Sequence, residues 1–450
     1  MNRENRLITG KIGPTLMRLS FAYFLTLGVE NLYPIIGMVI VDRYAGAVAL
    51  SAVTVSGRVM MVITALIMGC CAGVTVMVGQ RTGQGDNAAI SKVIANSAIV
   101  MCLLAAGILF FVIFGRRIIV SLMQTPFEAA ESARNYLLIR GLGVPLLVCC
   151  AYIGEIYHGL GDVKTPLIFA FVSCAIKCVS AFVFIGYGHM GALGDAGAMV
   201  VAHGICSVLM TRHLFSSRSK ILPSRRELRP QRKVIGEMAR ISLPMIFYFL
   251  QSNVSLLVIT AIINTGGLIM SAAAGVSENI INIELVIPAA VGQAILVMSA
   301  QNLGAGQTKR ANRTFLQGLL FCILCGLLFC LFCQFAPQVL PGVITHDAAV
   351  KKAAALYLRT YSIDCILMGA IHCFNAFFMA RGKSSICMGH AFVAAVLGRI
   401  PLSYMISHMA GTTLLHMGFA APASSILSLV ICVFFIYRLK LLEKVKMVPA

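Results

Sequence analysis

Charged residues are scarce in this chain, and their scarcity excludes most soluble folds. Only 12% of the 450 residues are Asp, Glu, Lys or Arg, whereas a water-soluble domain carries about 25%. Tryptophan is absent, and there are only 16 acids against 36 Lys and Arg. With 59% hydrophobic residues and a mean hydropathy of +0.90, the composition is typical of a protein that lies mostly inside a membrane.

No stretch remains for a soluble catalytic domain, because twelve apolar runs occupy the chain. Each run can cross a bilayer core, which needs about 20 apolar residues per helix. The first run is too long for a signal-peptide core and lacks a small-residue cleavage site after it, so we expect it to be retained. The runs are residues 15–40, 50–78, 91–115, 134–157, 165–187, 193–214, 236–264, 271–299, 311–335, 353–379, 384–407 and 413–437.

The net charge of +20 predicts membrane topology rather than nucleic-acid binding. With the N-terminus inside, the inner segments hold 23 of the Lys and Arg residues and the outer segments hold 6. Lys and Arg resist translocation, so this bias predicts that both termini are cytoplasmic. We expect a multi-pass protein of the cytoplasmic membrane whose basic inner surface contacts anionic lipid.

One short glycine-containing motif occurs twice in the sequence, 221 residues apart. Both copies follow an apolar run and have Gln, Gly and Gly at one spacing: Gln80, Gly83, Gly85 and Gln301, Gly304, Gly306. The loop predicts a tight turn after the second span of each half, where glycine supplies a positive φ.

The repeat divides the chain into residues 1–215 and 236–450, joined by a basic cytoplasmic linker at 216–235. Each half has six spans, and because six is even both halves enter the membrane in one orientation. We therefore predict an all-α polytopic membrane protein with twelve transmembrane helices in two six-helix lobes, related by a parallel pseudo-two-fold repeat. Two such lobes can expose a cleft to either side of the membrane in turn.

Motifs for enzyme chemistry, metals and nucleotides are weak or missing. Cys322, Cys325, Cys330 and Cys333 spell CxxC twice, but they lie within the ninth apolar run and read as small buried hydrophobes. There is no HExxH, and neither GQRTGQGD nor FFMARGKSS has the strand–loop–helix context of a nucleotide loop. We expect no enzyme activity, metal, nucleotide or nucleic acid, and no cofactor beyond a coupling ion.

The chain resembles the multidrug and toxic compound extrusion (MATE) family of bacterial secondary transporters. The resemblance lies in the two six-span lobes, the repeated Gln-x-x-Gly-x-Gly turns, ALSAV at 49–53, GLGDVKTP at 159–166 and RIPLSY at 399–404. It covers essentially the whole chain. It implies an antiporter that exports small organic compounds, often cationic, in exchange for H⁺ or Na⁺.

Three spans depart from the family pattern. The first-span carboxylate of the family falls on Gly37, or on Met38 in an alternative register, and the fifth-span Asn and acid fall on Lys177 and Ala181. The acid found early in the seventh span of other members falls on Gln251 or Ser252. The coupling ion and the charge of the substrate therefore stay open.

Polar residues at membrane depth are the candidates for coupling and substrate binding, because an ionisable group there costs about 2.5–3.5 kcal/mol or more. A carboxyl in a partly dry cleft can hold a proton on one side and release it on the other. The strongest candidates are Glu278, Glu284 and Asp364. The others are Glu30, Asn282, His372 and Asn375.

Three cations inside the spans are the expected partners of these acids. Lys177 and Arg399 are 222 residues apart, at matching places in the fifth and eleventh spans, and Arg58 lies in the second. Each acid can equally be a structural partner of one of these cations. For Lys177 we favour pairing with a nearby acid, because an unpaired buried Lys would be costly; the alternative is an anionic or zwitterionic substrate.

The leading hypothesis is a monomeric antiporter that exports small, cationic or amphipathic, drug-like compounds by alternating access. One alternative is a flippase for a lipid-linked precursor, supported only by Lys177, Arg58 and Arg140. Another is an exporter of an anionic or zwitterionic metabolite. An intramembrane enzyme is disfavoured, because no group of residues has the required geometry.

Overall fold

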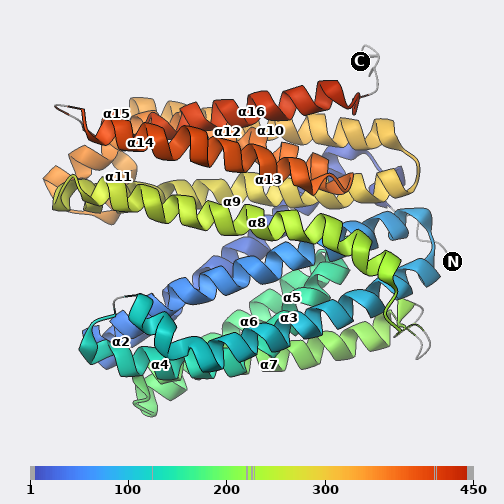
Figure 1. Cartoon of the computed structure of the whole chain (residues 1–450), viewed down its shortest axis with the longest axis horizontal. Coiled ribbons are helices and arrows are strands. Elements are labelled where there is room, and N and C mark those ends of the chain that lie inside the picture. Colours follow the sequence, from blue (N-terminus) through green and yellow to red (C-terminus); the bar gives the residue numbers. More distant parts are fainter. Residues whose placement is uncertain are drawn as a thin grey trace. The chain divides into compact units, whose positions relative to one another are not determined.

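The computed structural model describes residues 6–123, 125–218, 221–223, 227, 229–409, 411 and 413–442, so part of the predicted linker lies outside the described residues. Within these ranges the regular structure is helical throughout, with no strand (Figure 1). The chain begins with the short helix α1 (Arg6–Thr9) and the very long helix α2 (Ile12–Gln84).

Helix α2 contains the first two predicted spans. A straight helix of 73 residues would be about 110 Å long at 1.5 Å per residue, far more than one bilayer. Gly46 interrupts it with a φ of 74° and a ψ of −176°, a conformation that glycine adopts without a steric penalty. The sequence predicts a connection at residues 41–49, and the structure makes it with almost no loop.

The other helices follow the predicted order. The first half continues with α3 (Asn87–Leu122), α4 (Phe127–Leu142), α5 (Val144–Gly159), α6 (Lys164–Ala181), the π-helix η1 (Phe182–Tyr187) and α7 (Gly191–Ser217). The second half has α8 (Arg232–Asn264), α9 (Leu268–Gly304), α10 (Thr308–Phe335), α11 (Val339–Ile344), α12 (Ala348–Ala380), α13 (Ser384–Val393), the π-helix η3 (Ala394–Arg399), α14 (Ile400–Ser407), α15 (Leu414–Met417) and α16 (Ala420–Arg438).

The predicted twelve-span fold is confirmed. In the described part of the chain ten helices are long and apolar enough to cross a membrane, and α4 with α5 forms one more span that bends by 47°. Counting α2 as two spans at Gly46 brings the total to twelve. The bend between α4 and α5 falls at Gly143 and Pro145, where proline removes a backbone donor.

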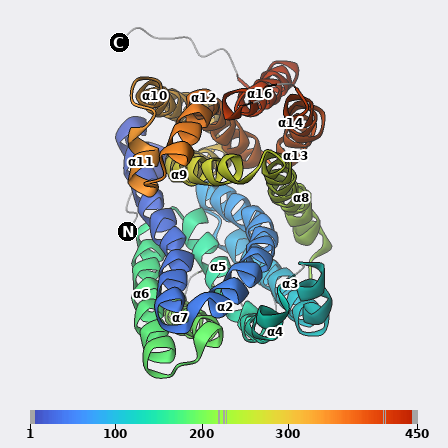
Figure 2. The same cartoon turned by 90° about the vertical axis from the view of Figure 1, so that its left-hand side faces the viewer.

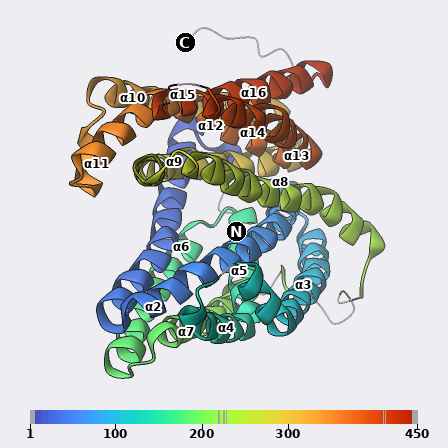
Figure 3. The ribbon, with the colours of Figure 1, turned by 60° about the vertical axis from the view of Figure 1, so that its left-hand side comes forward.

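The helices form two compact units: Leu25–Ile246, and Phe247 onward together with the described residues up to Phe24. In the first unit α7 packs against both α6 and α4, and Figure 2 shows α6 and α7 side by side. In the second unit α9 and α10 pack on α12, while α13 and α14 lie along α16 (Figure 3).

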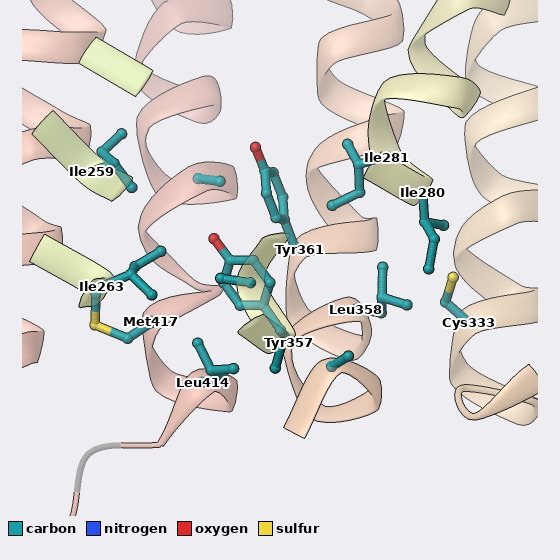
Figure 4. Packing of buried hydrophobic residues seen from close by; sticks show 14 of the residues in the cluster. Ile259, Ile263, Ile280, Ile281, Cys333, Tyr357, Leu358, Tyr361, Leu414 and Met417 are labelled. Carbon is teal, nitrogen blue, oxygen red and sulfur yellow. The ribbon is translucent and has the colours of Figure 1, made fainter. Parts of the chain in front are cut away.

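The core of the second unit is built from aliphatic residues around two tyrosines of α12. Tyr357 and Tyr361 are one helical turn apart, with ring centroids 5.2 Å apart and an edge-to-face arrangement. Ile259, Ile281 and Leu414 surround them (Figure 4). This packing fixes the face of α12 that also carries Asp364.

Glycines with positive φ repeat at the same interval as the sequence motif. Gly85 and Gly306 have φ values of 72° and 74°, which confirms the predicted turns. All eight such glycines of the described residues form pairs 220 or 221 residues apart: Gly46 with Gly267, Gly85 with Gly306, Gly161 with Gly382, and Gly191 with Gly411. The two halves therefore share their turn geometry as well as their order of helices.

Candidate functional site

A buried ion pair joins α6 and α7 in the first unit. Lys177 Nζ lies 3.4 Å from Asp195 Oδ1, and the two side chains are only 1% and 5% exposed. Lys177 also donates a hydrogen bond to the main-chain carbonyl of Tyr33 on α2. The other carboxylate oxygen, Asp195 Oδ2, accepts a hydrogen bond from the Tyr136 hydroxyl at 3.0 Å. Both buried charges are therefore compensated, as burial requires.

Gly37 makes room for this ion pair. A Cβ atom on Gly37 would fall on Asp195 Oδ1 and close to Lys177 Nζ. The missing side chain lets both groups approach the backbone of α2. At the place where the sequence comparison expects a first-span acid, the carboxylate comes instead from α7.

Two further basic residues, Arg140 and His203, surround the pair. Both are buried with 8% of their surface exposed, and Lys177 lies within electrostatic range of each. Arg140 Nε has no hydrogen-bond partner. We call Tyr136, Arg140, Lys177, Asp195 and His203 the Lys177 cluster; its permanent charges are two cations and one acid.

Glu155 belongs to a separate network in the same unit. It accepts a hydrogen bond from Thr75, and its Oε2 lies 3.3 Å from His158 Nδ1. Glu30 on α2 is exposed and within electrostatic range of both Glu155 and His158. Arg58 is exposed as well, and none of the ion pairs of the described residues includes it.

Arg399 and Asp364 form the polar centre of the second unit. Arg399 Nη2 donates to the Tyr361 hydroxyl at 2.6 Å, and its guanidinium lies 5.5 Å from that ring's centroid. Asp364 is 3% exposed and lies in the electrostatic field of Arg399. Ser425 on α16 is within hydrogen-bonding range of Asp364, but Asp364 Oδ1 has no partner.

Two acids of α9 lie near this centre. Glu284 is 7% exposed, contacts Cys365 and lies in electrostatic range of Asp364, while its Oε2 has no hydrogen-bond partner. Glu278 is half-buried and in electrostatic range of Arg399. Asn282, one turn beyond Glu278, is exposed. The structure thus brings Glu278, Glu284, Asp364 and Arg399 into one polar cluster.

His372 and Asn375, predicted to share a polar face with Asp364, have other partners. His372 Nδ1 lies 2.9 Å from the Met368 carbonyl of its own helix. Asn375 donates to the Tyr248 hydroxyl at 3.1 Å, and its Oδ1 lies 2.9 Å from His390 Nε2. His390 in turn contacts the Ser428 hydroxyl at 2.6 Å, so Asn375 is held in a structural network.

Comparison with known proteins now identifies the family. The MatE family profile matches residues 22–183 and 244–405, one segment in each half. The chain belongs to the MATE family. Members of this family are transporters rather than enzymes, and the apolar helices make this chain an integral membrane protein.

Relatives of this MATE chain include a Bacillus subtilis protein named probable multidrug resistance protein YpnP. The two are 23% identical over 60% of each chain. A Shewanella oneidensis protein named FAD transporter is 22% identical over 98% of this chain and 97% of its own length.

Among solved structures, a transporter from Pyrococcus furiosus superposes with a TM-score of 0.90 at 20% identity, covering 98% of each chain. That transporter is described as having a binding pocket of reverse polarity, which suggests a different function within the MOP superfamily. At this identity the likeness concerns the fold alone.

Two candidate site residues of this MATE chain were not predicted from the sequence. Asp195 lies inside the sixth apolar run, eighteen residues after Lys177, so its position among apolar residues was the available signal. His390, only 1% exposed, lies inside the eleventh run. Their partners, Lys177 and Asn375, are on other helices, and sequence spacing alone does not indicate which helix faces meet.

Proposed function

We propose that this MATE-family chain is a secondary antiporter that exports small organic compounds across the cytoplasmic membrane in exchange for protons. The observation that carries the proposal is the pair of buried acids Glu284 and Asp364, each with an oxygen that has no hydrogen-bond partner among the described residues. The four ion pairs formed by the described residues include neither of them.

Buried acids of this kind suit proton coupling. An uncompensated charge at membrane depth is costly, and Glu284 and Asp364 lie in each other's electrostatic field. A proton is the smallest group that removes the cost. Arg399, near Asp364, favours release of that proton once water or substrate reaches the site.

Alternating access supplies the transport cycle in this proposal. When the site opens to the inside, the protonated acids release their protons and the site binds substrate. When the site opens to the outside, the substrate leaves and the acids are protonated again. Both termini lie in the cytoplasm, the halves are residues 1–215 and 236–450, and the monomer needs only membrane lipid and the coupling ion. Sodium is the alternative coupling ion.

The substrate is a small amphipathic compound, and the acids around Asp364 suit a cationic one. The multidrug-resistance name of the Bacillus relative supports this class. The Lys177 cluster favours a second candidate, an anionic or zwitterionic metabolite, and the Shewanella relative's name, FAD transporter, agrees with it. The lipid-linked flippase has less support, because Lys177 is paired with Asp195 and Arg58 stands apart, which leaves Arg140 alone of its three cations.

Proteoliposomes with an imposed proton gradient test the proposal. Efflux of a fluorescent organic compound should follow the gradient, and Glu284→Gln or Asp364→Asn should reduce gradient-driven efflux at least tenfold. Glu131→Gln, an exposed acid on α4, is the matched control and should transport normally. Efflux that follows a sodium gradient instead, or that survives both substitutions, would overturn the assignment of the proton to these acids.

A further inference from the structure

Arg140 is a buried cation that takes part in none of the ion pairs of the described residues. It lies on α4, is 8% exposed, and its Nε is buried without a hydrogen-bond partner. None of the hydrogen bonds and ion pairs formed by the described residues involves its guanidinium. A guanidinium carries five donors and stays charged at any physiological pH, so leaving it unpaired in an apolar interior is unfavourable.

The one acid of the Lys177 cluster is already engaged elsewhere. Asp195 Oδ1 pairs with Lys177 at 3.4 Å, and Asp195 Oδ2 accepts the Tyr136 hydroxyl at 3.0 Å. His203, the other neighbour, cannot supply negative charge. The cluster therefore keeps one excess positive charge, and that charge resides on Arg140.

Arg140 also lies well inside a predicted span rather than at its end. It is thirteen residues beyond Phe127, where α4 begins, or about 20 Å along the helix. The bent span continues for nineteen more residues, to Gly159 at the end of α5. Gly143, which follows α4, allows a close approach to Val200 of α7, since a Cβ on Gly143 would meet the Val200 side chain.

We propose that the Arg140 guanidinium is the docking point for an anionic group, a phosphate or carboxylate, carried by the transported compound. A guanidinium presents two parallel N–H donors that match the oxygens of either group. His203 lies within electrostatic range of it. The burial of Arg140, well inside its span, favours a substrate over a lipid headgroup. The proposal rests on the chain being a transporter, and it gives substrates with a negative group a site separate from the acids of the second unit.

Equilibrium binding to the purified full-length protein in detergent tests the site without requiring transport. Riboflavin and flavin mononucleotide are matched fluorescent probes that differ only by a phosphate. The wild-type protein should bind the phosphorylated probe about tenfold more tightly or better. Arg140→Gln should abolish this difference and leave riboflavin binding unchanged. Arg58→Gln, which removes an exposed cation, should behave like the wild type.

Thermal stability provides a second readout. Removal of an uncompensated buried cation should raise the Tm of the ligand-free Arg140→Gln protein, whereas loss of a structural arginine would lower it. Inorganic phosphate should stabilise the wild type and leave Arg140→Gln unchanged.

Three results would overturn the proposal: equal binding of both flavins by the wild type, a phosphate preference that survives Arg140→Gln, or a lower Tm in that variant. Stabilisation by phosphatidylglycerol in nanodiscs that depends on Arg140, without any by phosphate, would assign the site to lipid and contradict a substrate site. If proton-driven efflux fails while the Arg140-dependent binding holds, only the coupling proposal falls.

Discussion

Lys177 Nζ and Asp195 Oδ1 occupy the space that a side chain on Gly37 would fill. The pair is buried between α6 and α7, 3.4 Å apart, and a Cβ on Gly37 would overlap the carboxylate. One glycine of α2 thus permits a salt bridge between two other helices. Because Gly37 has no side chain, the ion pair fits against α2, and any larger residue at position 37 should displace the pair.

Gly37→Ala should therefore destabilise the protein. The added methyl group must displace two buried charged groups that are paired with each other, and overpacking of this kind costs about 1–3 kcal/mol. Gly28→Ala is the matched control on the same helix, because nothing lies within 4 Å of its Cβ position, and alanine there should be neutral or stabilising. Thermal unfolding in detergent compares the two; an equal Tm for both variants would contradict the packing at Gly37.

Lys177 and Asp195 should show strong coupling in a double-mutant cycle. Lys177→Met leaves a buried carboxylate without its cation, which costs about 3–5 kcal/mol. The double variant Lys177→Met/Asp195→Asn removes both charges and should recover most of the lost Tm. If the two effects simply add, the side chains do not interact in solution.

Tyr361→Phe should weaken the polar centre of the second unit. It removes the hydroxyl that accepts the 2.6 Å hydrogen bond from Arg399, and hydrogen bonds to charged groups contribute about 1.5–3 kcal/mol. Tyr357→Phe, one turn earlier on the same helix, is the control, since its hydroxyl forms no hydrogen bond with a described residue. Both Tm and gradient-driven efflux should fall in the first variant only; a loss of equal size in the second would point to core packing instead.

Arg381, just beyond the end of α12, should make stability depend on alkaline pH. Its guanidinium lies 3.5 Å from the centroid of the Phe377 ring, and burial lowers the pKa of Arg381 from 12.5 to about 10. Between these values the unfolded chain binds more protons than the folded one, so the wild type should gain stability as pH rises above about 10.

Arg381→Gln lacks this titrating group. The difference in unfolding free energy between the wild type and Arg381→Gln, measured from pH 9 to 11, should shift in favour of the wild type as pH rises. A constant difference across this range would show that the Arg381 pKa is the same in the folded and unfolded states.

Much of this fold could be predicted from the apolar runs and the positions of the glycines. All twelve predicted spans correspond to helical segments, the first two of them within the single helix α2, and Gly85 and Gly306 have the predicted positive φ. The π-helical segments η1 and η3 and the direct passage through Gly46 were not predicted. Such local changes in winding depend on how neighbouring helices pack, which the hydrophobic pattern of one segment does not contain.

The partners of the buried charged residues were harder to predict from the sequence. The sequence singles out Lys177, but its partner Asp195 is on another helix, and the space at Gly37 is on a third. Asp364 and Asn375 lie on the predicted face of α12 yet have unrelated partners. A helical wheel shows which residues share a face, whereas contacts between helices depend on tertiary packing.

The paired glycines have a consequence for charge. A homodimer of identical six-span subunits would also repeat each turn, but it would have to repeat each charge. Here the turns at Gly85 and Gly306 match while the charges differ: two cations and one acid around Lys177, three acids and one cation around Arg399. Within a single chain the two halves can share their turns and still differ in charge, so that the two polar clusters are chemically distinct.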